Sequence, residues 1–143
     1  MGRRRLEKGK KMFAMQSRGA IRPRMVLGFA DSTYAAQCGR YFRRHGWEVH
    51  LAADGAEIQR QVESFRPAVL VLDAAFIGDG TVASWRAWLG PHPELKVILF
   101  AAERSAAMLR LQETLHARAL CTRQDALQGL GEAVLDKHFA KAI

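Results

Sequence analysis

Short apolar segments alternate with amphipathic segments along most of this chain. Five short segments rich in Val, Ile, Leu and Ala predict strands, at residues 25–29, 48–52, 68–72, 95–100 and 118–122. Between them, apolar residues recur at spacings of three and four, which predicts helices at 33–45, 56–65, 81–89 and 105–116, and a last helix after Asp125. Strict alternation of strand and helix predicts an α/β fold. Right-handed crossovers would then give a mostly parallel sheet covered by helices on both faces.

The first predicted strand and helix carry the clearest local signals. Asp31 and Ser32 offer an N-cap to the helix that follows. The spacing places Tyr34, Cys38, Tyr41, Phe42 and His45 on its inward side. Gly28 does not fit this pattern, because glycine weakens the interior of a strand.

Positive charge is concentrated at the N-terminus. The formal net charge is +8, with 22 Lys and Arg against 14 Asp and Glu among 143 residues. Residues 1–24 hold Arg3, Arg4, Arg5, Lys8, Lys10, Lys11, Arg18, Arg22 and Arg24 but only one acid, Glu7, so the remainder is neutral overall. We therefore predict a basic N-terminal extension over 1–24 and one folded domain over 25–143. The extension is open to three interpretations: a phosphate-binding arm, a solvated tail, or sequence upstream of a natural start at Met12, Met15 or Met25.

The rest of the composition narrows the class of protein. Hydrophobic residues make up 49% and charged residues 25%, as in an ordinary globular domain. No apolar run approaches the roughly 20 residues of a membrane helix, and no secretory signal follows the basic start. Cys38 and Cys121 lack metal-ligand spacing, so we expect free thiols and a cytoplasmic protein.

Candidate chemistry lies where the predicted strands end, because ligands of open parallel sheets bind beyond the carboxyl ends of the strands. The residues at these ends are Phe29, Ala30 and Asp31, then Asp73, then Ala101, Ala102 and Glu103, and finally Thr122, Arg123 and Gln124. Asp73 ends the central strand, where a carboxylate could hold a cation or attack phosphorus. The alternative is a structural role, in which Asp73 pairs with Arg123 or caps the following loop.

Four stretches carry a resemblance to a known family: MVLGFADS, HGWEVHLAADGAE, RPAVLVLDAAF followed by GDG, and LKVILFAAE. Through them, the sequence from Met25 to about Leu135 resembles the receiver domain of bacterial two-component response regulators. The resemblance implies a flavodoxin-like fold. It also implies a site in which an aspartate ending the third strand accepts a phosphoryl group. Asp73 stands at that position.

The other positions of the family's site depart from its pattern. The acidic pair that holds magnesium in the family falls on Phe29 and Ala30, and Asp31 comes one position too late. Ala101 replaces the Thr or Ser that reports phosphorylation, and Arg123 replaces an invariant lysine. Magnesium requires several oxygen ligands, and phosphoryl transfer depends on the charge neutralisation that the ion supplies.

We therefore predict a degenerate, or pseudo-, receiver that is not an enzyme and has no cofactor, with magnesium bound weakly at best. Its partner would be a sensor kinase or a downstream effector, bound through the family's docking surface at roughly 105–138, and a homodimer is a further option. One alternative is a functional phosphoacceptor that uses Asp73. Another is a nucleic-acid-binding adaptor that acts through residues 1–24.

A dinucleotide-binding site is the weakest alternative. The segment Gly78-x-Gly80-x-x-Ala83 matches the dinucleotide fingerprint. However, four residues separate the predicted strand from its first glycine, where the fingerprint requires an immediate turn.

Overall fold

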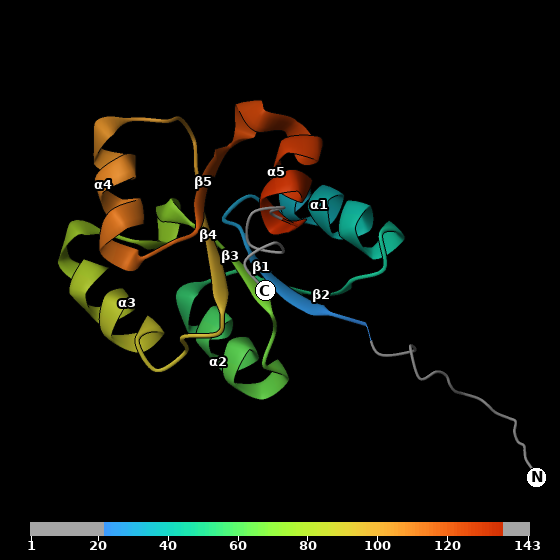
Figure 1. Ribbon diagram of the computed structural model, residues 1–143, viewed down its shortest axis with the longest axis horizontal. Helices are drawn as coiled ribbons and strands as arrows, with labels where there is room; N and C mark the ends of the chain where they lie inside the picture. The colour runs from blue at the N-terminus through green and yellow to red at the C-terminus, as the bar shows by residue number, and fades with distance from the viewer. Residues whose placement is uncertain (1–21, 136–143) are drawn as a thin grey trace, which may run out of the picture.

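The computed structural model describes residues 22–135, which form a five-stranded parallel sheet in the order β2-β1-β3-β4-β5 (Figure 1). The strands are β1 (Arg24–Gly28), β2 (Glu48–Ala52), β3 (Val69–Asp73), β4 (Lys96–Ala101) and β5 (Ala119–Thr122). The helices are α1 (Ser32–Arg44), α2 (Gly55–Phe65), α3 (Val82–Leu89), α4 (Ala106–Leu115) and α5 (Ala126–Leu135). Short 3₁₀ turns occupy Ala74–Phe76, Asp79–Thr81 and Arg123–Asp125. The predicted parallel sheet with helices on both faces is confirmed.

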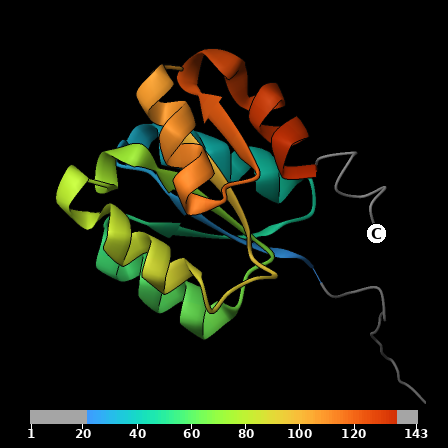
Figure 2. The same ribbon diagram turned by 60° about the vertical axis from the view of Figure 1, so that its left-hand side comes forward.

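Two apolar layers hold the helices against the sheet. Helices α1 and α5 cover one face, and α2, α3 and α4 cover the other (Figures 1 and 2). Side chains of each strand alternate between the layers: Leu27 and Val71 point to the first, and Val26 and Leu70 to the second. Because β1, β3 and β4 are covered on both faces, they lack the polar alternation of a half-exposed strand.

Local capping sets the ends of the helices. Asp31 is the N-cap of α1, as predicted, and its carboxylate accepts hydrogen bonds from the N–H groups of Thr33 and Tyr34. The predicted inward position of His45 is wrong. The helix ends at Arg44, so His45 leaves the helical path, and its exposed ring lies 2.8 Å from the carbonyl oxygen of Tyr41.

Most of the predicted basic extension, residues 1–21, lies outside the described residues, as does 136–143 of the predicted domain. Within residues 22–135, no helix is both long enough and apolar enough to cross a membrane.

Both cysteines are buried as free thiols. Burial raises the pKa of Cys38 and that of Cys121 from 9.0 to about 11 each. Because the thiolate is the reactive form, we expect both to react with a disulfide reagent at pH 8 at least about 100-fold more slowly than an unfolded cysteine. Thiol titration with and without 6 M guanidinium measures this. Rapid reaction of either thiol in the native protein would contradict the described packing.

Candidate functional site

Asp73 lies at the carboxyl end of β3, between the ends of β1 and β4. The residue is only 8% exposed. Its Oδ2 accepts a hydrogen bond of 2.9 Å from the N–H of Ala30, and its Oδ1 accepts one of 2.9 Å from the N–H of Ala75. The side chain therefore caps the 3₁₀ turn that follows β3 and ties it to the end of β1. The capping role considered from sequence is thus present, whereas the pairing of Asp73 with Arg123 is not.

The family that the sequence resembles has a pair of acidic residues at the end of the first strand. An aromatic side chain occupies the first position of that pair here. Phe29 is 2% exposed and packs edge-on against Phe100 and Tyr34, with ring centroids 4.8 Å and 5.2 Å away. Tyr34 stacks on Phe100 at 5.2 Å, which completes a cluster of three rings beneath the edge of the sheet. Ala30, at the second position, is exposed and offers only its backbone to Asp73.

Asp31 turns toward α1 and Arg123 rather than toward Asp73. Its Oδ1 caps the helix, and its Oδ2 accepts a hydrogen bond of 3.0 Å from Nη2 of Arg123. The same guanidinium lies over the ring of Tyr34, with Cζ 4.5 Å from the centroid. Arg123 therefore links the end of β5 to the start of α1, although the two residues are 92 positions apart.

The hydrogen bonds to Asp31 also perturb its acidity. The N–H of Tyr34 and then the guanidinium of Arg123 lower the pKa of Asp31 below its usual 3.8. The stability that these contacts add is therefore present above that value, and it is lost as the pH falls through the lowered pKa.

The ends of β4 and β5 offer no hydroxyl at the predicted switch position. Ala101 is buried and ends β4, while Ala102 and Glu103 after it are exposed. Thr122, at the end of β5, is buried, and its N–H donates to Oδ2 of Asp125 at 2.6 Å. The hydroxyl of Thr122 lies 3.3 Å from the same oxygen, so it is held within its own turn.

This set of donors does not fit a magnesium ion. Magnesium needs near-octahedral oxygen coordination with at least one or two free carboxylates. Both oxygens of Asp73 already accept backbone hydrogen bonds, and those of Asp31 are engaged by the helix cap and by Arg123. Among residues 22–135, no group of three or more His, Cys, Asp or Glu is placed to hold a metal ion.

The glycine-rich segment does not form a dinucleotide site. The 3₁₀ turn Ala74–Phe76 separates β3 from Gly78, and a second such turn precedes α3. The N–H of Gly78 donates to the hydroxyl of Thr81, which closes the loop on itself. A strand that turns directly into a helix, as the fingerprint requires, is absent from this segment.

Comparison with known proteins identifies the fold. No protein-family model matches the sequence, and no curated protein does. Among solved structures, a CheY-like response regulator receiver domain protein from Methanospirillum hungatei is similar with a TM-score of 0.72 and 16% identity, over 82% of this chain and 94% of that one. The receiver domain of a response regulator from Bermanella marisrubri is similar with a TM-score of 0.67 and 21% identity, over 79% and 95% of the two chains.

A third structure, a response regulator protein from Burkholderia pseudomallei, contains a phosphorylated aspartic acid and a calcium ion. It is similar with a TM-score of 0.70 and 12% identity, over 84% of this chain and 70% of that one. The described domain therefore has the fold of response regulator receiver domains.

Proposed function

We propose that this chain is a receiver-like module of bacterial two-component signalling that acts through protein contacts and lacks the magnesium-dependent phosphorylation switch. The receiver fold and the sequence stretches that resemble the family support the signalling class. The rearranged site at the end of the sheet supports the loss of the switch.

One observation carries this proposal: Phe29, in the core, and Ala30 take the two places of the acidic pair, and the next acid, Asp31, is engaged by Arg123. A divalent ion would have to displace a guanidinium and would gain Asp73 as its one uncompensated carboxylate. Phosphoryl transfer depends on neutralising the negative charge of the transferred group. Without the ion, an acyl phosphate on Asp73 is not expected to form at a useful rate.

The docking surface proposed at roughly 105–138 is supported by the exposure of α4. Leu115 is the one buried residue of this helix, and Leu109 is 44% exposed. Leu109 is also the one large hydrophobic side chain exposed among the described residues. A sensor kinase or an effector with an apolar contact would bury it, and a second copy of the chain is the alternative partner. Residues 136–138 of this surface lie outside the described part.

Treatment with acetyl phosphate and magnesium tests the loss of the switch. We expect the intact mass of the wild-type protein to stay unchanged, as for Asp73→Asn, because the ion that activates the reaction is not held. Ala30→Asp serves as the matched gain-of-function variant, since it places a carboxylate next to Asp73 without disturbing the core. A magnesium-dependent gain of one phosphoryl group in the wild type, absent in Asp73→Asn, would overturn the proposal.

A functional phosphoacceptor is the second candidate. It is favoured by the position of Asp73 at the carboxyl end of the central strand β3. The same labelling experiment decides between the two candidates, because only the phosphoacceptor predicts a label on wild type that Asp73→Asn removes.

A further inference from the structure

The two outermost strands of the sheet each turn one row of backbone groups away from it. Within residues 22–135, β2 pairs only with β1, and β5 pairs only with β4. The N–H of Glu48 donates to the carbonyl oxygen of Pro23 on the β1 side, so alternation turns the backbone groups of Val49 and Leu51 outward. A row of this kind can pair with a strand of another molecule, and natural proteins usually protect it.

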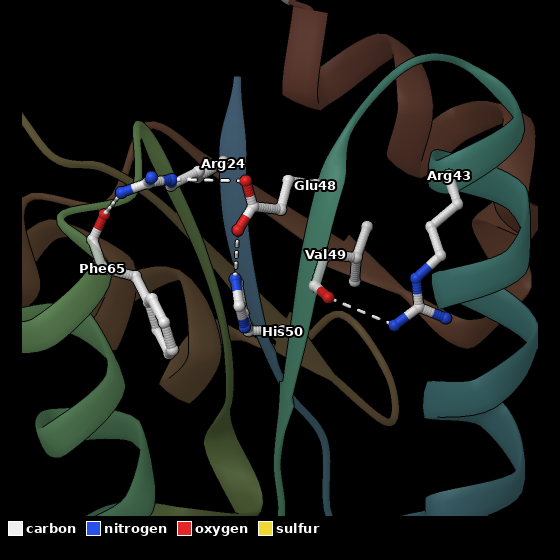
Figure 3. A network of polar contacts seen from close by, with 6 residues as sticks. All are labelled: Arg24, Arg43, Glu48, Val49, His50 and Phe65. Carbon is white, nitrogen blue, oxygen red and sulfur yellow. Dashed lines mark hydrogen bonds and ion pairs between the residues drawn. The ribbon is translucent and has the colours of Figure 1, made fainter. Parts of the chain in front are cut away.

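Side chains of α1 and α2 bond to the outward carbonyl groups of β2. Nη2 of Arg43 donates to the carbonyl oxygen of Val49 at 3.1 Å, and Figure 3 shows this side chain reaching from α1 to the strand. From α2, Nε2 of Gln61 donates to the carbonyl oxygen of Leu51 at 3.0 Å. Both outward carbonyl oxygens of β2 are therefore hydrogen-bonded to helices of the same molecule. We call Arg43 and Gln61 the edge-capping pair.

A glycine inside α1 makes room for the Arg43 side chain. Gly39 is buried, and a Cβ there would lie 3.4 Å from Nη1 of Arg43 and 3.5 Å from Cδ2 of Leu51. Glycine destabilises the interior of a helix, so its presence at this position needs a reason. A side chain larger than alanine would extend into the space that the guanidinium occupies. The residue at position 39 therefore lets Arg43 lie against the edge of β2.

The opposite edge of the sheet, at β5, is bonded in the same way. Nη2 of Arg104, in the loop before α4, donates to the carbonyl oxygen of Leu120 at 2.9 Å. Two residues later, the N–H of Thr122 donates to Oδ2 of Asp125. Side chains of this protein therefore bond to backbone groups at both edges of the sheet. The repetition, from separate parts of the chain, indicates a common role.

A separate network of polar contacts holds β2 in the sheet. The Glu48 carboxylate lies 2.8 Å from Nε2 of His50 and 3.4 Å from Nε of Arg24 (Figure 3). Nη1 of Arg24 donates to the carbonyl oxygen of Phe65 at 2.8 Å, which ties the start of β1 to the end of α2 (Figure 3). Because these contacts do not involve the edge-capping pair, removal of the pair should leave β2 in place.

We propose that the edge-capping pair, Arg43 and Gln61, keeps β2 from pairing with the β2 strand of a second copy of this chain. A two-fold axis perpendicular to the sheet would place the two β2 strands side by side and antiparallel, since a two-fold contact uses the same segment of both copies. The outward groups of Val49 and Leu51 in one copy would then face those of Leu51 and Val49 in the other. To make these bonds, the second copy must displace both capping side chains.

Closed edges also bear on how this domain meets other proteins. Addition of a strand to a sheet edge is one general mode of protein recognition, and it needs unoccupied backbone groups. With the edges bonded internally, the helical faces remain as the surfaces for protein contacts. This inference does not depend on the function proposed for the Asp73 site, because it involves neither that residue nor magnesium.

The test compares the full chain carrying Arg43→Ala/Gln61→Ala with a matched control, Arg44→Ala/Gln59→Ala. The control removes the same residue types from the same two helices, and among the described contacts of β2 there is none with either control residue. Alanine favours helices, so α1 and α2 should be kept in both variants. Analytical ultracentrifugation over a concentration series measures the self-association constant, and amide hydrogen exchange by NMR locates the contact.

We expect Arg43→Ala/Gln61→Ala to raise the self-association constant at least about tenfold over the wild type, because each net hydrogen bond changes an equilibrium constant by roughly fivefold and two acceptors are released. The control should match the wild type. Exchange of the outward amide protons of Val49 and Leu51 should slow as the concentration of the double variant rises, since pairing protects them.

Two results would overturn the proposal. One is an equal self-association constant for the two double variants, with circular dichroism showing that both are folded. The other is stronger self-association without slower exchange at Val49 and Leu51, because the contact would then use another surface. If the double variant does not fold, Arg43→Met and Gln61→Met carry the same comparison singly, since each keeps the aliphatic part of the side chain and loses the donor. Self-association equal to that of the wild type in both would then overturn the proposal.

Discussion

Truncation of Phe29 to alanine is expected to lower the free energy of unfolding by about 3–5 kcal/mol, the range for large aromatic truncations in cores. The side chain is buried and packs edge-on against both Phe100 and Tyr34 in the three-ring cluster. Its removal leaves a cavity that both neighbours line, and it removes two edge-to-face ring contacts. Urea unfolding monitored by circular dichroism measures the loss.

Two controls show whether the aromatic packing is responsible. Phe29→Leu keeps most of the side-chain volume and should lower the free energy of unfolding clearly less than Phe29→Ala does. Phe65→Ala removes the same atoms from a half-buried position, where the ring stacks on His50, and should also cost less. A loss below about 1 kcal/mol for Phe29→Ala would show that this position is not part of the core.

Substitution of Gly28 by alanine is expected to destabilise the domain by about 1–3 kcal/mol, although alanine usually favours a strand over glycine. A Cβ at this position would lie 2.5 Å from Cδ1 and 2.9 Å from Cγ1 of Ile58. Ile58 belongs to α2 and is fully buried in the apolar layer against the sheet, so its side chain has little freedom to withdraw. The comparison of wild type and variant by urea unfolding gives the difference directly.

A double-mutant cycle identifies the contact responsible. Ile58→Val removes Cδ1, the atom nearest to the new Cβ. The double variant should therefore lose less free energy of unfolding than the sum of the losses of the two single variants. Gly80→Ala is the matched control, because a Cβ there meets nothing within 4 Å. Strict additivity of the two changes would contradict the close approach of α2 to β1.

Gly28 also shows where the sequence pattern is informative and where it is not. The pattern predicted the first strand despite this glycine, because four apolar neighbours outweigh one weak residue. Glycine is needed at position 28 because Ile58 approaches it closely, from a helix that begins more than 25 positions later. The spacing of residues along the chain does not predict that contact. Tertiary packing of this kind becomes visible only in the structure.

In the candidate site, too, some features could be predicted from the sequence and others could not. Asp73 could be placed from sequence, because it is the first polar residue after an apolar strand in the middle of an alternating α/β pattern. The burial of Phe29 follows from the same pattern. The ion pair between Asp31 and Arg123 could not be predicted, since it joins two exposed side chains whose approach depends on how α1 and the end of β5 pack. Sequence reasoning considered Asp73 as the partner of Arg123 and missed Asp31.

A calorimetric titration of the wild-type protein with magnesium at neutral pH tests the central claim most directly, with Asp73→Asn and Ala30→Asp measured alongside. We expect no binding heat below about 10 mM magnesium for wild type or Asp73→Asn. Measurable binding heat is expected for Ala30→Asp, because this variant restores one carboxylate beside Asp73. Saturable binding by the wild type that Asp73→Asn abolishes would contradict the account.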